Sequence, residues 1–140
     1  MESDHVDQLL AQWARQRPDL DCSPMGVLGR VARMAAIAGR EVSETLKECG
    51  LLGSDFDILA TLRRAGEPLT PTALYQSAML SSGAMTARLD KLEQRGLIRR
   101  EASPDDRRSL LVCLTEPGRE LVDHAVEQHL SLIHISEPTR

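Results

Sequence analysis

Aromatic side chains are scarce in this chain, which has one Trp, one Tyr and one Phe among 140 residues. Since 41% of the residues are nevertheless hydrophobic, the core has to be built from Leu, Val, Ile, Ala and Met. No apolar run approaches the roughly 20 residues that span a bilayer. The segment Met1–Gln8 is acidic and lacks the layout of a secretory signal. We therefore expect a cytoplasmic protein with no membrane partner.

Cysteine and histidine are too few and too dispersed to build a disulfide framework or a metal site. The cysteines are odd in number and widely spaced, which is typical of neither a disulfide framework nor a zinc site: Cys22, Cys49 and Cys113. The histidines do not pair with Cys or carboxylates at metal-binding spacing: His5, His124, His129 and His134. Gly83 and Gly96 fit a turn and a helix stop, not a phosphate-binding loop. We expect no enzymatic activity, no cofactor and no metal.

The distribution of charge along the chain says more about possible DNA binding than the net charge does. A formal net charge of −4 argues at first against nucleic acid. From Ser81 to Arg108, however, seven basic and five acidic residues give a net +2, so the rest of the chain has a net −6. Because phosphate contacts are local, a basic face on an acidic protein can still bind DNA.

Hydrophobic periodicity predicts helices in the first half of the chain. Apolar residues recur at helical spacing over Asp4–Arg17, and Pro18 ends that segment. A continuous apolar stripe predicts a long helix over Gly26–Cys49. Ser54 is expected to cap a third helix, which Gly66 ends.

The second half predicts a winged helix-turn-helix. Thr70 and Pro71 suit the N-cap and first residue of a short helix that runs to about Leu80. After a tight turn, Ser81 is expected to cap a second helix that ends at Gly96. Two strands and a last helix follow: 97–101, 109–114 and, from Thr115 on, the helix. The fold class is mainly α with a small β-wing.

The second of these short helices has candidate DNA contacts. Ser82, Thr86 and Lys91 lie away from its predicted buried stripe, and short hydroxyls at a helix N-terminus can approach base edges and phosphates. The same pattern is compatible with an ordinary amphipathic helix whose polar face is solvated. The wing that follows favours DNA binding.

The predicted wing loop concentrates charge. Asp106 precedes Arg108 by two residues, and a carboxylate there can hold the guanidinium extended toward a narrow minor groove. Arg107 adds a second cation. Taken alone, the spacing favours a solvated charged turn, but a preceding helix-turn-helix makes DNA contact the favoured interpretation.

These segments resemble the MarR family signature in order and spacing. The matching segments are 82–93, 96–98, 105–109 and 114–118. The resemblance covers about Asp4 to His129 and implies a homodimer, held by the first and last helices, on a pseudo-palindromic operator. It assigns the winged helix to 54–114 and dimerisation to 1–53 and 115–129.

A sharper resemblance is to the urate-responsive PecS/HucR branch of that family, through 13–21 and 23–27. It implies a ligand site formed by Trp13, Asp57, Arg88 and Arg100. A flat anionic purine would suit an aromatic face, guanidinium groups and one carboxylate. In this branch the ligand displaces the aspartate, here Asp57, which loosens Arg100 and shifts the recognition helix. Ordinary packing of Trp13 and a structural ion pair at Asp57 are the alternatives.

The last segment, Leu130–Arg140, resembles the translation of a sequencing adapter residue for residue. We interpret 130–140 as read-through rather than native sequence, with an ordinary tail as the alternative. The last helix is then truncated near His129, and we expect weak dimerisation of the chain as given, with a homodimer in the native-length form.

Three functions remain open. The first is a repressor released by a small anionic ligand such as urate or another aromatic or phenolic acid. The second is a cysteine-based redox repressor that uses Cys22, although no cationic cluster adjoins it in sequence to lower its pKa. The third is an interaction module without DNA, which the charge of the wing and helix argues against.

Overall fold

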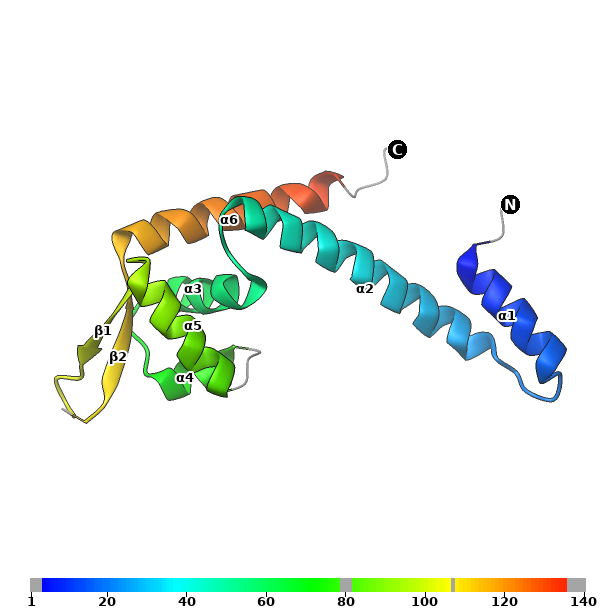
Figure 1. Ribbon diagram of the computed structural model, residues 1–140, viewed down its shortest axis with the longest axis horizontal. Coiled ribbons are helices and arrows are strands. Elements are labelled where there is room, and N and C mark those ends of the chain that lie inside the picture. Colours follow the sequence, from blue (N-terminus) through cyan, green and yellow to red (C-terminus); the bar gives the residue numbers. More distant parts are fainter. Residues whose placement is uncertain (1–3, 79–81, 107, 136–140) are drawn as a thin grey trace. The chain divides into compact units, whose positions relative to one another are not determined.

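The computed structural model describes residues 4–78, 82–106 and 108–135. Eight elements follow one another along the chain (Figure 1): α1 (His5–Gln16), α2 (Ser23–Glu48), α3 (Gly53–Ala65), α4 (Pro71–Ser77), α5 (Ser82–Gln94), β1 (Ile98–Ala102), β2 (Leu110–Leu114) and α6 (Glu116–Ile135). They form two compact units, Met1–Glu41 and Val42–Arg140, and the end of α2 belongs to the second.

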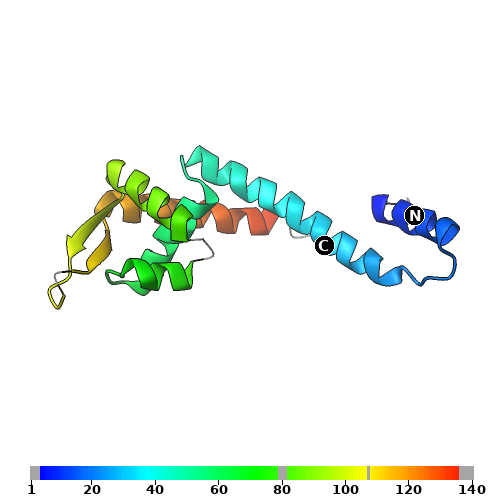
Figure 2. The same ribbon diagram turned by 60° about the horizontal axis from the view of Figure 1, so that its bottom comes forward.

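In the first unit α1 packs on the beginning of α2 (Figure 2). Val6 of α1 is buried against Gly29 of α2. Gly26 allows the close approach of the two helices, because a Cβ there would lie only 3.0 Å from Leu10 Cδ1. The guanidinium of Arg30 in α2 pairs with Asp4 at 3.2 Å and Asp7 at 2.7 Å. These two carboxylates also belong to the capping box of α1, so the pairing ties its first turn to α2.

The long helix begins at Ser23 rather than at Gly26 as expected. The Asp21 carboxylate accepts the Ser23 N–H at 3.0 Å and so satisfies one donor at the helix start. Pro24 is compatible with the first turn because its missing N–H would have had no helical partner there.

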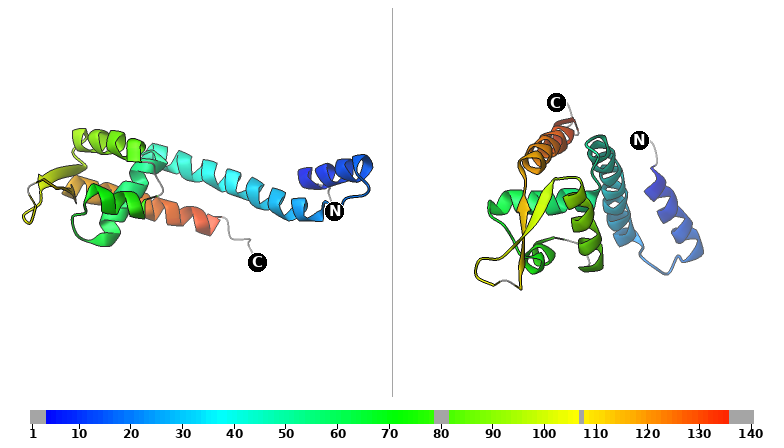
Figure 3. Two further views of the ribbon diagram at one scale, coloured as in Figure 1. Left: turned by 90° about the horizontal axis from the view of Figure 1, so that it is seen from below. Right: turned by 60° about the vertical axis from the view of Figure 1, so that its left-hand side comes forward.

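The second unit is the winged helix (Figure 3). The largest fully buried side chains of the described residues are all aliphatic, as the composition predicts: Leu51, Ile58, Leu59, Leu74, Leu92, Ile98, Val112 and Val122. The antiparallel strands pair Ile98 with Leu114 at one end and Ala102 with Leu110 at the other. The hairpin projects away from the helices, as a wing does.

Helix α3 is capped differently from our expectation. It begins at Gly53 with Leu52 as the N-cap residue, and the Asp55 carboxylate accepts the Leu52 N–H at 3.0 Å. Ser54 lies inside the first turn, so it cannot act as the N-cap. An acidic residue at the third helical position can reach back to that N–H, as in a capping box. The predicted end is confirmed, since Gly66 has φ 70°, a left-handed conformation that favours glycine.

The predicted start of the helix-turn-helix is confirmed. Thr70 Oγ1 accepts the Ala73 N–H at 3.1 Å, and Pro71 is the first residue of α4. This helix ends at Ser77, earlier than the expected Leu80. The expected cap at Ser81 lies outside the described residues.

Helix α6 extends to Ile135, six residues beyond the end that we expected at His129. The segment 130–135 contains neither Gly nor Pro, so nothing in it interrupts the backbone hydrogen bonds. α6 packs on α3, where the His129 ring lies 5.9 Å from that of Phe56. In the described part of the chain no helix is long and apolar enough to cross a membrane.

Candidate nucleic-acid interface

The second helix of the helix-turn-helix, α5, has one buried and one exposed face. Met85, Leu89 and Leu92 are buried at helical spacing against the core. Thr86 and Lys91, two of the predicted DNA contacts, are exposed. The Ser82 side chain lies outside the described residues. The arrangement leaves a polar helix face open to a duplex, as major-groove recognition requires.

The wing turn is organised by Asp106, although not in the way that we expected. Its carboxylate accepts the backbone N–H of Arg108 at 3.0 Å and the Ser109 hydroxyl at 3.3 Å. These bonds serve the turn itself, and among the described residues no ion pair joins this carboxylate to the Arg108 guanidinium. Arg108 is exposed, and within the described residues its guanidinium has no ion pair. Its charge is therefore available to DNA, whereas Arg107 lies outside the described residues.

Arg100 of β1 binds the wing to the recognition helix. Its guanidinium lies 2.7 Å from Asp90 and 3.1 Å from Glu93, both in α5. Glu93 also accepts the backbone N–H of Arg100 at 2.8 Å. The hydrogen bond from Arg100 lowers the pKa of Glu93, and the bond from Glu93 in turn raises the pKa of Arg100. β1 and α5 are thus joined by charged hydrogen bonds, so a displacement of one element is transmitted to the other.

Arg88 of α5 makes an internal ion pair. Its Nε lies 2.9 Å from Asp55 Oδ1 in α3, and the two side chains are 22% and 3% exposed. Neither atom makes a well-directed hydrogen bond, so the contact is mainly electrostatic. Of the predicted ligand residues, Arg88 and Arg100 both have carboxylate partners that fix the recognition helix.

Comparison with known proteins identifies this arrangement. The MarR family profile matches residues 53–110. Over 127 residues the chain is 39% identical to the HTH-type transcriptional regulator PecS of Dickeya dadantii, which is 89% of this chain and 76% of that protein. The chain belongs to the MarR family. It is therefore a DNA-binding transcriptional regulator with a winged helix and not an enzyme, and its similarity to PecS supports the PecS-like branch.

Solved structures of MarR-family proteins have the same fold. Apo MarR of Escherichia coli is 28% identical, with a TM-score of 0.67 over 76% of this chain and 79% of that one. CouR of Rhodococcus jostii, bound to p-coumaroyl-CoA, is also 28% identical, with a TM-score of 0.64 over 79% and 75%. The predicted mainly helical class with a small wing is confirmed.

The four predicted effector residues of this MarR-family chain lie in both units. Asp57 is half-buried in α3 and interacts with another group of the protein. Its backbone carbonyl accepts a hydrogen bond from the Thr61 hydroxyl at 2.7 Å. Trp13 is 43% exposed on α1, in the first unit. Asp57, Arg88 and Arg100 belong to the second unit. The combined site remains a prediction.

Sequence reasoning missed Asp55 and Glu93 as partners of the two arginines. Asp55 had a detectable signal, because residues 55, 59 and 62 fall on one helix face and the other two are leucines. An acidic residue on a buried face requires a partner. Glu93 gave no such signal, since its half-exposed position is ordinary for an amphipathic helix.

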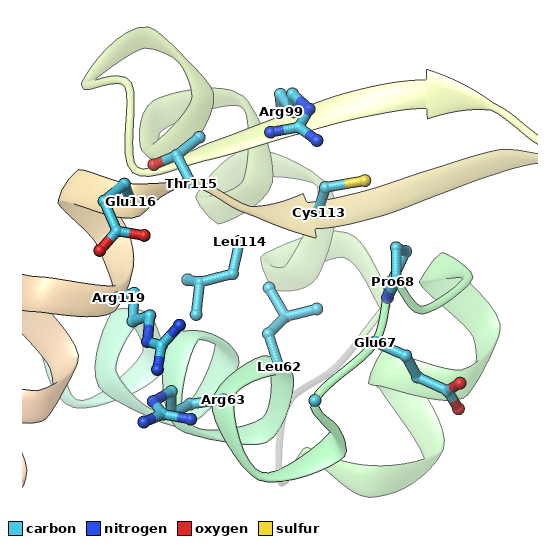
Figure 4. Close-up of a pocket in the computed structure, with 11 residues that line it drawn as sticks. Leu62, Arg63, Glu67, Pro68, Arg99, Cys113, Leu114, Thr115, Glu116 and Arg119 are labelled. Atoms are coloured by element: carbon cyan, nitrogen blue, oxygen red, sulfur yellow. The ribbon is translucent and has the colours of Figure 1, made fainter.

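A pocket of about 270 Å³ opens between the end of α3, the base of the wing and the start of α6 (Figure 4). Leu62 and Leu114 contribute apolar lining, and Arg63 and Arg99 border it. Both arginines already have carboxylate partners, Asp123 and Glu101 respectively. Three arginines and two glutamates line the pocket, and none of the described DNA or effector candidates is among its lining residues.

Proposed function

We propose that this MarR-family regulator is a homodimeric repressor that a small anionic aromatic ligand, urate first among them, releases from a pseudo-palindromic operator. The observation that carries the proposal is the set of carboxylate–guanidinium pairs at Arg88 and Arg100. An anion that competes for either guanidinium acts on the elements that present DNA contacts. DNA affinity and ligand binding are then coupled through α5 and β1.

The dimer is supported by the apolar surface of the first unit. Several large hydrophobic side chains of α2 are exposed: Met25, Val27, Leu28, Val31, Met34 and Ile37. An exposed patch of this kind marks an interaction site. A second copy is the partner we propose, because two winged helices about 34–36 Å apart engage two half-sites of one operator.

The ligand class is supported by chemistry and by the relatives. Trp13 offers an aromatic face, and Asp57 offers a carboxylate acceptor for a ring N–H. PecS is similar over most of the chain, and CouR was crystallised with p-coumaroyl-CoA. Any such ligand must bind the DNA-incompetent state more tightly, because equal binding to both states shifts nothing.

The test is a urate titration of the complex between the protein and a duplex selected by it from a random pool, with salicylate and hydrogen peroxide in parallel. We expect urate to release the DNA and to quench the fluorescence of Trp13, the only Trp in the chain. Release by salicylate alone would indicate a phenolic-acid sensor. Release by peroxide alone would indicate the Cys22 switch.

Variants separate binding from release. Asp57→Asn should weaken release more than urate binding, because the lost carboxylate is the group that the ligand is proposed to displace. Asp123→Asn is the matched control, since it makes the same chemical change at an α6 residue paired with Arg63. Equal effects of the two variants would remove Asp57 from the mechanism.

A further inference from the structure

Asp55 is the one acidic residue among the buried residues that the structure describes. Its Oδ2 accepts the Leu52 N–H at 3.0 Å, and its Oδ1 lies 2.9 Å from Arg88 Nε. One carboxylate therefore contacts both the first turn of α3 and the recognition helix. A charge that is 97% removed from solvent has to be compensated within the protein.

Arg88 is confined by its position on α5. It lies beside the buried stripe of Met85 and Leu89 and is only 22% exposed, so its guanidinium faces the protein interior more than the solvent. If α5 turned or slid on α3, the distance between the guanidinium and Asp55 would grow and both charges would lose their partner. The ion pair thus stabilises one orientation of α5 on α3 relative to orientations that are slightly rotated or shifted.

We propose that Asp55 is a positioning residue for sequence-specific DNA recognition, acting through Arg88 and independently of any effector. It touches no DNA in this scheme. It fixes the orientation of α5, which places Thr86 and Lys91 against base edges and phosphates.

For a substitution of Asp55, the proposal predicts a change in DNA affinity opposite to the one that charge alone predicts. Asp55→Asn removes a negative charge from the DNA-binding unit, which by Coulomb attraction alone strengthens binding to every duplex. The amide oxygen can still accept the Leu52 N–H, so the helix cap is retained. If α5 loses its fixed orientation, binding to the selected sequence instead weakens. Scrambled DNA is then bound at least as tightly as by the wild-type protein.

The experiment measures the affinity of the full chain for its selected duplex and for a scrambled duplex of equal length. For Asp55→Asn we expect the ratio of the two affinities to fall on the order of tenfold. Asp123→Asn, which removes the same charge from the Arg63 pair, should keep the wild-type ratio. An unchanged or increased ratio for Asp55→Asn would overturn the proposal.

A double-mutant cycle with Arg88→Met tests the route. If Asp55 acts through Arg88, adding Asp55→Asn to Arg88→Met lowers the ratio no further. Full additivity would show that Asp55 acts by another path and would refute the proposal. If Asp55→Asn alone fails to fold, the double variant can still be measured, because it buries neither the carboxylate nor the guanidinium. A wild-type ratio of selected to scrambled affinity in the folded double variant would also refute the proposal.

Discussion

Removal of the Arg108 side chain tests the wing directly. Arg108 is exposed next to a turn fixed by Asp106, and its guanidinium is not engaged by any described carboxylate. Arg108→Ala therefore removes a predicted DNA contact without leaving a buried partner uncompensated. We expect each wing to lose about 1–3 kcal/mol of binding free energy, or roughly 5- to 150-fold in affinity, if the guanidinium enters a narrow minor groove.

The dependence on salt distinguishes the two kinds of contact. A phosphate contact would reduce the slope of log affinity against log salt by about one unit per wing and weaken all sequences alike. A groove contact would act mainly on duplexes with a narrow minor groove. The measurement is fluorescence anisotropy on a labelled selected duplex over a range of salt concentrations.

The matched control is Arg15→Ala, which removes the same charge from an exposed position of α1 in the other unit. We expect it to change affinity for the selected duplex far less than Arg108→Ala does. If the two variants bind the duplex equally well at moderate salt, the wing has no part in recognition and our reasoning about it is wrong.

Three more changes test other parts of the fold. Asp106→Ala should weaken duplex binding, because the turn loses its bonds to a backbone N–H and a hydroxyl, whereas Asp106→Asn should retain most of the affinity; anisotropy titrations measure both. Met34→Glu puts a charge on the exposed apolar face of α2 and should shift the native-length protein toward monomer in sedimentation velocity; an unchanged dimer would place the interface elsewhere. The Arg100 guanidinium lowers the pKa of Glu93 from 4.5 in the folded state, so this pair stabilises the fold above that pH, and the contribution is lost as pH falls through the lower folded pKa. Urea unfolding between about pH 5 and 3 should therefore show a smaller pH dependence for Arg100→Met than for wild type.

Local sequence signals determined most of the secondary structure. The Thr70 cap with Pro71 after it, and the left-handed Gly66, follow from backbone hydrogen bonding and steric freedom within a few residues. Helix boundaries differed from the predicted ones where a neighbouring side chain satisfied a backbone group. At Ser23, for example, the Asp21 carboxylate accepts the backbone N–H. The aliphatic core followed from composition alone, because so few aromatic residues were available to fill it.

The partners of charged side chains were decided only by the tertiary structure. Helical periodicity places Asp55 on the leucine face of α3 and Asp57 on another face, but it does not identify Arg88 as the partner of Asp55. The packing of α5 on α3 brings the guanidinium to Asp55. Arg100 likewise meets Asp90 and Glu93 because the wing folds back on the helix before it. A sequence specifies which charges it contains and on which face each lies, but an ion pair also depends on a distance between elements, which packing sets.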